Sequence, residues 1–423
     1  MKRTFFYFLL CWLLTPQLWA QTISFSPKAD VPEENGLDRC FSFALNGKVY
    51  AGTGRDADAI MNNRVWEYDP ATDTWTQKND FPTVPQRNAF GLVINGIAYA
   101  GFGWDGGVTT WDPWFQYDPS SDTWISKSNP LDAGVDVGGF SATFELNGKG
   151  YFVCGSGANA EMNKVAEYDP ATDTWTQKND FPGEPRDFAF GEAIDGYGYV
   201  GMGDFFFAPP FYSDCYKYAP TADTGSPITP IPGLESGTIV EGACHTSFVH
   251  NEKLVLMNII LQSTSISEVT TLYVYDPPTD SWLIYEGAYP ADLFRIPILG
   301  KIGDKIYYGA GFSTTGIRKD FWEIDLSNLV TGLQETTPEL ENLWATAEGC
   351  NVSVSVPAEV YQQLGDQQLN LHFYTLAGQN VATYKLSDHK HNFDLSSVGT
   401  GALVWTVYAN GKPLRSSKIL LNK

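Results

Sequence analysis

The stretch Glu67–Pro82, EYDPATDTWTQKNDFP, recurs without a change at Glu167–Pro182. A weaker copy, QYDPSSDTWISKSNP, occupies Gln116–Pro130, about midway between the two. A period near 50 residues is typical of stacked supersecondary units, none of which can bury its apolar surface alone. The sequence therefore predicts a repeat architecture.

Each repeat carries the signals of four short strands. An Asn-Gly or Asp-Gly pair, such as Asn46-Gly47, predicts a type I′ turn between the first two strands. A Tyr and a Gly-x-Gly step follow, then a loop of variable length, a strand ending in Tyr-Asp-Pro, and a strand that opens with Trp, such as Trp75. The last repeat lacks its Trp strand, but Ser24–Pro32 aligns with Thr74–Pro82. We therefore expect the N-terminus to close a ring, which leaves only short sheet edges.

This pattern resembles the kelch-repeat family of β-propellers over roughly residues 22–332. Family members usually have adjacent glycines where this chain has Gly-x-Gly, and the fourth to sixth repeats are degraded. The resemblance implies an all-β fold with a six-bladed propeller over residues 21–332. The repeated Gly, Tyr and Trp residues are then interpreted as structural, because the rings fill the space between blades.

The termini and composition point to export. Residues 1–20 match a secretory signal peptide, with Lys2 and Arg3 before an apolar run too short to span a bilayer. No later segment is apolar enough to form a transmembrane segment, and the net charge of −22 disfavours binding to nucleic acid. Five cysteines would remain after removal of the signal, and secretion permits either disulfides or buried free thiols.

The C-terminal part has a different pattern. Residues 333–341 are polar and are predicted to form a linker, and residues 342–423 contain six or seven short alternating strands, which suggest a small Ig-like β-sandwich. Asn370–Thr383 (NLHFYTLAGQNVAT) and Phe393–Thr400 (FDLSSVGT) resemble the C-terminal sorting domain of the type IX secretion system of Bacteroidetes. That resemblance implies a secretion machinery as partner and a location outside the cell or on its surface. The alternative is an ordinary Ig-like accessory domain.

The variable loops are the natural place for a binding site. In a propeller, the loops between second and third strands and between blades share one face, and function usually resides in such loops. Aromatic rings there stack on sugars or on partner side chains, although local packing is an equal alternative. The candidates are Trp104, Trp111, Phe206 and Tyr212.

A set of arginines is expected at the same face. Four of them precede the first turn of a repeat by seven to nine residues, and a fifth follows a glycine step; they are Arg39, Arg87, Arg186 and Arg295, and Arg55. The planar guanidinium fork matches carboxylate geometry. The alternative role is salt bridging between blades, for example to Asp38 or Asp187.

Two classes of function follow. The first is a monomeric binding protein that recognises a glycan or protein ligand, with no cofactor and no metal. The second is an enzyme, since secreted kelch propellers include sialic acid mutarotases, which resemble this chain only in the kelch pattern and use acid–base chemistry. No catalytic residue is assigned, but Glu192, Glu241 and Asp204 are the acidic candidates. His245 and His250 are too few for a copper radical site, and Asp56 with Asp58 is a weak calcium signal.

Overall fold

The computed structural model divides the chain into two compact units, residues 1–331 and 332–423. The structure describes residues 23–107, 114–156, 161–204, 212–231, 243–262, 266–267, 272–285, 297–313, 315–327, 329, 344–356, 369–375, 380–387, 390–398, 400–409 and 412–421. The predicted signal peptide and linker therefore lie outside the described residues. A search of the described part of the chain for a helix able to cross a membrane finds none.

The described residues of the first unit form six antiparallel sheets with a path of four strands each, and the first four follow chain order. They are β2–β5 (Phe41–Leu45, Lys48–Gly52, Val65–Asp69, Thr74–Lys78), β6–β9 (Phe90–Ile94, Ile97–Gly101, Phe115–Asp118, Thr123–Ser126), β10–β13 (Ala142–Leu146, Lys149–Val153, Val165–Asp169, Thr174–Gln177) and β14–β17 (Phe190–Ile194, Tyr197–Gly201, Cys215–Ala219, Thr224–Pro227). A short 3-10 helix, Pro130–Ala133, follows β9.

The last two sheets depart from this simple order. The fifth comprises β18 (Ala243–His250), β19 (Lys253–Gln262), β21 (Leu272–Asp276) and β22 (Ser281–Tyr285), and the two-residue β20 (Ile266–Ser267) pairs with β19. The sixth comprises β23 (Ile298–Ile302), β24 (Lys305–Gly309), β27 (Phe321–Asp325) and the N-terminal β1 (Ser24–Lys28), while β25 (Phe312–Ser313) and β26 (Gly316–Ile317) form a separate hairpin. Because β1 pairs with β27, with Phe25 opposite Ile324, the two ends of this unit share one sheet.

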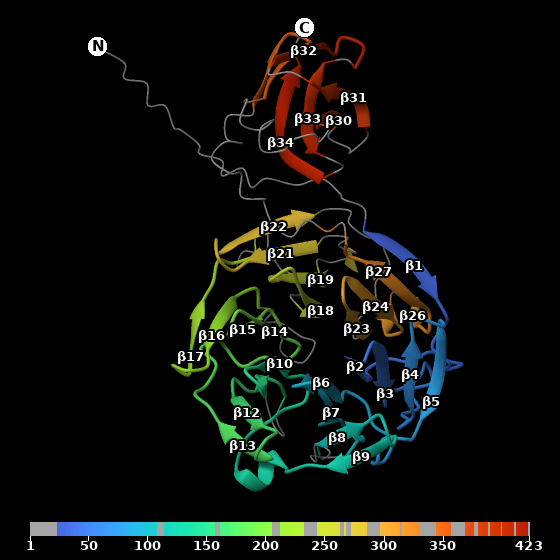
Figure 1. Ribbon diagram of the computed structural model, residues 1–423. Coiled ribbons are helices and arrows are strands. Elements are labelled where there is room, and N and C mark those ends of the chain that lie inside the picture. The colour runs from blue at the N-terminus through green and yellow to red at the C-terminus, as the bar shows by residue number, and fades with distance from the viewer. Residues whose placement is uncertain are drawn as a thin grey trace. The chain divides into compact units, whose positions relative to one another are not determined.

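The six sheets stand around a central opening, with the first strand of each sheet innermost (Figure 1). This arrangement is a β-propeller, as the repeat pattern predicts. The predicted type I′ turns are present: Asn46 and Gly47 both have positive φ, at 53° and 76°, and Asn95 with Gly96 repeats the geometry. The tight turns and the variable loops therefore lie on opposite faces of the ring.

An aspartate at each outer turn forms hydrogen bonds that link one sheet to the next, and we call this arrangement an Asp clasp. The Asp73 carboxylate accepts a hydrogen bond from the Tyr68 hydroxyl at 2.7 Å and another, at 2.9 Å, from the backbone N–H of Ala29, which directly follows β1 of the sixth sheet. Trp75 completes the contact by donating its Nε1–H to the Ala29 carbonyl. The same Tyr–Asp–backbone arrangement recurs at Tyr117–Asp122–Asn79, Tyr168–Asp173–Ser128, Tyr218–Asp223–Asn179 and Tyr275–Asp280–Thr229. The repeated Tyr and Trp residues are therefore structural, as predicted.

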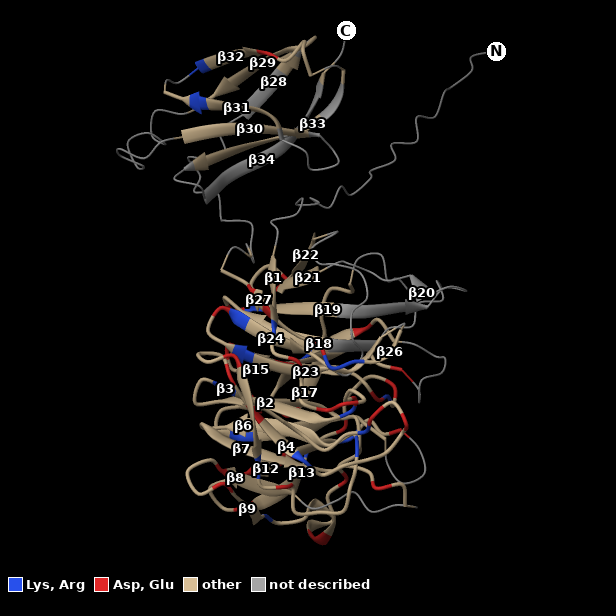
Figure 2. Cartoon of the chain, turned by 90° about the vertical axis from the view of Figure 1, so that its right-hand side faces the viewer, with Lys and Arg blue, Asp and Glu red and all other residues tan. Residues whose placement is uncertain are grey.

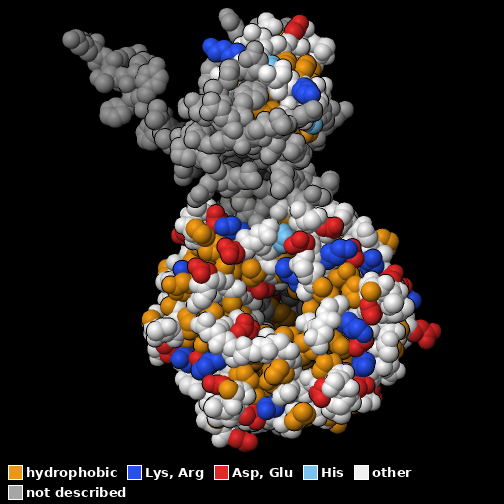
Figure 3. Space-filling view, viewed as in Figure 1, with side chains coloured by type: hydrophobic (Ala, Val, Ile, Leu, Met, Phe, Trp, Pro, Cys, Tyr) orange, Lys and Arg blue, Asp and Glu red, His pale blue; other side chains and the backbone are white. Residues whose placement is uncertain are grey.

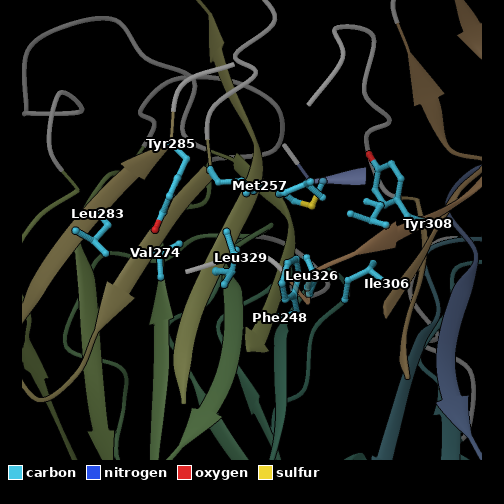
Figure 4. Close-up of a cluster of buried hydrophobic side chains, with 13 residues drawn as sticks. Phe248, Met257, Val274, Leu283, Tyr285, Ile306, Tyr308, Leu326 and Leu329 are labelled. Carbon is cyan, nitrogen blue, oxygen red and sulfur yellow. The ribbon is translucent and has the colours of Figure 1, made fainter. Parts of the chain in front are cut away.

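The junction between the fifth and sixth sheets is built differently. No outer turn joins the third and fourth strands of the sixth sheet, because its fourth strand comes from the N-terminus. A cluster of buried apolar side chains fills the junction, with Phe248 and Val274 from the fifth sheet and Ile306 and Tyr308 from the sixth (Figure 4). Burial of each such side chain contributes about 1.5–3 kcal/mol. Apolar clusters also fill the other junctions, so in the described residues this junction has the apolar packing without an Asp clasp.

The second unit consists of two sheets that enclose a shared apolar core. One sheet has the order β28 (Trp344–Glu348), β29 (Asn351–Ser355), β32 (Lys390–Asp394), and the other the order β31 (Asn380–Leu386), β30 (Leu369–Thr375), β33 (Gly401–Ala409), β34 (Lys412–Leu421). Val352 and Val354 from the first sheet and Leu371, Phe373 and Trp405 from the second are all buried in one cluster. The alternating pattern of the sequence therefore corresponds to a two-sheet sandwich.

The structure shows whether two of the cysteines are free thiols. Cys40 and Cys154 are buried and carry free thiols, and burial raises the pKa of each to about 12. They behave as small apolar side chains and not as reactive groups.

Candidate functional site

The site is positioned by a short backbone bridge just before each innermost strand. Asp38 pairs with Arg55, Arg87 with Trp104, Gly139 with Ser156, and Asp187 with Asp204. These pairs are equivalent, so the same place in successive blades carries very different side chains. They lie at the loop face, where the chain enters strands such as β2 and β6, and loops of that face carry basic and acidic residues close together (Figure 2).

The predicted arginines are not equivalent to one another. Arg87 occupies the bridge position, whereas Arg39 lies one residue after it and Arg186 one residue before it. Arg39 also has a positive φ of 58°, so the backbone is not extended there. The arginines therefore do not form a regular ring, and Arg295 lies outside the described residues.

The prediction that Arg186 contacts a ligand is not supported by its surroundings. The side chain is fully buried, and its guanidinium donates to both carboxylate oxygens of Asp214 at 2.6 and 3.0 Å and to the carbonyl oxygens of Glu184 and Met202. Its fork also lies over the ring of Tyr212, 4.1 Å from the ring centroid. The difference from Arg87, which lies at the bridge itself, is the bidentate pairing of Arg186 with Asp214. We assign Arg186 and Tyr212 to blade packing.

Arg39, Arg55 and Arg87 do gather, around a single buried carboxylate. Asp38 accepts from Arg55 through both oxygens, at 2.9 and 3.3 Å, and lies 3.6 Å from Arg39 Nε. Burial lowers the pKa of Arg39 to about 10, and the nearby Arg55 and Arg87 add to this effect while Asp38 opposes it. Burial and the proximity of Arg55 also lower the pKa of Arg87. Three guanidiniums and one carboxylate leave a local excess of two positive charges.

Arg87 and Trp104 form the part of this cluster that faces outward. The guanidinium carbon of Arg87 lies 4.6 Å from the centre of the Trp104 ring, a cation–π arrangement, and Trp104 donates its Nε1–H to the carbonyl of Gly107 at 2.9 Å. Both side chains are partly exposed. We call the set Arg39, Arg55, Arg87 and Trp104 the arginine–tryptophan site.

Two polar atoms beside this site have no hydrogen-bond partner among the described residues. They are Arg87 Nε and the amide oxygen of Asn88, whose side chain is only 7% exposed. Asn88 is tied to the cluster through its backbone N–H, which donates to the Arg39 carbonyl at 2.7 Å. Buried polar groups nearly always have hydrogen-bond partners in folded proteins. A ligand or an ordered water would supply the partners for these two atoms.

Most of the remaining aromatic and acidic candidates lie outside the described residues or away from the arginine cluster. Trp111 and Phe206 lie outside the described residues, as does the acidic candidate Glu241. Asp204, the second acidic candidate, is buried and backbone-paired with the equally buried Asp187. Of the aromatic residues predicted for the face, the structure places Trp104 alone in contact with the arginine cluster.

A second feature is the central channel, visible as the hollow in the middle of the ring (Figure 3). It has a volume of ≈ 550 Å³ and is lined by the innermost strands of all six sheets. Most lining residues are small or apolar, and the ionisable ones are Glu145, Glu192 and Lys301. Burial raises the pKa of Glu192 to about 7, although a hydrogen bond from the Ser247 hydroxyl and the charge of Lys301 act in the opposite direction.

Sequence reasoning named Asp38 as a salt-bridge partner of the arginines, and Arg55 pairs with it, but it missed three other residues of these two features. Asn88, Ser247 and Lys301 are ordinary strand or turn residues with no motif around them. The available signal for Asn88 was its adjacency to Arg87. For Ser247 and Lys301 the signal was their position on innermost strands, which an alignment of the degraded repeats could have revealed.

Comparison with known proteins supports the fold but assigns no function to the site. No protein-family model matches the chain, and no curated protein matches it in sequence. Among solved structures, "Structure of YjhT" is similar at a TM-score of 0.55 and 15% identity, covering 69% of this chain and 95% of that chain. At this level of identity the likeness concerns the fold alone. The first unit has a β-propeller fold.

Proposed function

We propose that the protein is a binding protein that recognises a carboxylate-bearing glycan or protein ligand at the arginine–tryptophan site. The observation that carries this proposal is the excess positive charge. Three guanidiniums cluster around one carboxylate in a chain whose net charge is −22. A carboxylate of the ligand would neutralise that excess and accept from the guanidinium forks.

The surroundings support a ligand with an apolar part. Trp104 presents a partly exposed ring, and Ile60 and Val84, in loops next to the cluster, are 63% and 56% exposed. An aromatic or aliphatic face stacks on the apolar side of a sugar ring as well as on apolar side chains of a peptide. The site therefore suits either an acidic glycan or an acidic peptide segment.

The test is a binding screen of the full chain against a glycan array and a library of acidic peptides. Each positive ligand is measured again with its carboxylate converted to an amide, and with the Arg87→Ala variant. We expect both changes to reduce affinity at least tenfold, because each removes one side of a charge-assisted hydrogen bond. Lys164→Ala provides a matched control, since it removes one positive charge from an exposed pair with Asp180. Ligands that bind the Arg87→Ala variant as tightly as the native chain would contradict the proposal.

A second candidate function is sugar mutarotation or epimerisation, as in N-acetylneuraminate epimerase. The observation that favours it is Glu192, because a carboxyl group that titrates near neutral pH can act as both acid and base. Against it, the described groups that act on Glu192 electrostatically are Ser247 and Lys301, and no arginine of the described part of the chain is among them. Proton NMR of freshly dissolved N-acetylneuraminate tests it: faster anomer exchange that disappears in Glu192→Gln would support an enzyme.

We also propose that residues 1–20 direct export and that residues 342–423 serve type IX secretion, on the sequence resemblances alone. Both are testable by expression in a Bacteroidetes host with and without residues 342–423. The proposal expects the full chain outside the cell or on its surface and the truncated chain in the periplasm. Equal export of both forms would leave the second unit as an accessory domain.

A further inference from the structure

We propose that the central channel is a second binding site, which takes a small organic carboxylate between Lys301 and Glu192. The site is separate from the arginine–tryptophan site, so either proposal can fail without the other. The argument starts from the channel itself, which is ≈ 550 Å³ in volume and lies on the axis between six strands. This volume would accommodate a molecule as large as a sugar acid.

Lys301, on β23, is the cationic side of the site. It lines the channel and is partly exposed, and it forms no hydrogen bond or ion pair with any residue that the structure describes. Its charge nevertheless acts on two neighbours, since it contributes to lowering the pKa of His250 and opposes the rise of the Glu192 pKa. An ammonium group in a confined space without a counter-ion attracts an anion.

Glu192, on β14, supplies a second hydrogen-bonding group, and β18 of the fifth sheet lies between β14 and β23. Its Oε1 accepts from the Ser247 hydroxyl at 2.8 Å, and its Oε2 makes no hydrogen bond to a described residue. Glu192 and Lys301 do not form an ion pair within the described chain, so space remains between the two groups. When protonated, the Glu192 carboxyl donates its O–H to a carboxylate oxygen whose other oxygen accepts from Lys301.

The site is therefore linked to protonation. Because the pKa of Glu192 is about 7, the acid form predominates below neutral pH and the carboxylate form above it. The carboxylate form would repel an anionic ligand, so binding at higher pH requires uptake of one proton. Other charged groups near the channel are Glu145, whose Oε1 accepts from the backbone N–H of Gly148, and His250, which lies 3.9 Å from the exposed Asp304.

The experiment is isothermal titration of the full chain with acetate and with glucuronate, from about pH 5.5 to about pH 8.5. We expect saturable binding at one site, with affinity falling about tenfold for each pH unit above 7. Buffers of different ionisation enthalpy should show the uptake of up to one proton per ligand above that pH. Acetate alone as a ligand would mean that the channel admits only small carboxylates, and glucuronate alone would assign the site to sugar acids.

Three variants make the inference falsifiable. Lys301→Gln should reduce acetate or glucuronate affinity at least tenfold, and Glu192→Gln should retain binding but remove its dependence on pH. Ser247→Ala, which removes the hydroxyl whose hydrogen bond lowers the pKa of Glu192, should move the pH dependence of binding to higher pH, and it tests the site if a charge variant does not fold. Absence of saturable binding, or binding that is lost in Arg87→Ala and kept in Lys301→Gln, would overturn the proposal, and the second result would assign the ligand to the loop face.

Discussion

The guanidinium of Arg87 lies over the indole ring of Trp104, and the two residues are also joined by backbone hydrogen bonds in both directions, at 3.1 and 2.7 Å. The stacking is therefore held by the frame of the second blade and not by a loose loop. Pre-organised side chains lose little conformational entropy when a ligand binds. The relation explains how a partly exposed arginine can be kept in a fixed orientation at the mouth of the ring.

Replacement of Trp104 tests this orientation. Trp104→Ala should lower affinity for a carboxylate ligand of the loop face about tenfold, because a cation–π contact contributes about 0.5–2 kcal/mol and its loss frees Arg87. Trp104→Phe keeps a ring and should lower affinity less. Thermal unfolding should change little in either variant, since the ring is partly exposed. Equal affinities of the native chain and both variants would show that the stacking has no role in binding.

Arg186 leads to the opposite expectation. Arg186→Met should destabilise the propeller by about 3 kcal/mol, because it removes the ion pair between the fully buried Arg186 and the partly exposed Asp214 and leaves two carbonyl oxygens without their donor. Differential scanning calorimetry should show a clearly lower Tm, while ligand binding at the loop face remains. Lys164→Met, which breaks an exposed ion pair, is the control and should cost at most about 1 kcal/mol. Similar Tm values for the two variants would show that Arg186 is not structural.

The Asp clasps predict how stability responds to acid. Hydrogen bonds from the Ala29 N–H and the Tyr68 hydroxyl lower the pKa of Asp73 in the folded protein. A depressed pKa contributes stability above the ordinary pKa of an aspartate, about 4, and that contribution is lost as pH falls through the folded value. Asp73→Asn, which keeps a side chain suited to positive φ, should lower the Tm at pH 7 and converge with the native chain near pH 3. Melting curves that remain separated by the same interval at both pH values would argue against the linkage.

More of the fold than of the candidate site could be predicted from the sequence. The Asn-Gly turns, the spaced Tyr and Trp and the alignment of Ser24–Pro32 with a fourth strand all reflect local geometry that repeats, so they predicted the sheets and their order. The arginines follow no such repeat. Their distances to the next turn are seven, eight and nine residues for Arg39, Arg87 and Arg186. Arg39 and Arg186 both lie one residue from the bridge, and Arg39 has a positive φ of 58°, so the spacing could not predict that one joins the cluster and the other pairs with Asp214.

The last prediction concerns Glu192 and uses stability in place of binding. Burial raises its pKa to about 7 in the folded protein, whereas an unfolded glutamate titrates near 4.3. Between these values the folded chain holds a proton that the unfolded chain has lost, so this residue makes folding progressively less favourable as pH rises through that interval. Glu192→Gln removes the ionisation and keeps an acceptor for Ser247. The variant should match the native Tm near pH 4 and exceed it at pH 8, with the difference developing between about pH 4 and 7 and constant above. A constant difference across the whole range, or no difference, would mean that Glu192 ionises as freely in the channel as it does in water, and the proton-linked site would then lose its physical basis.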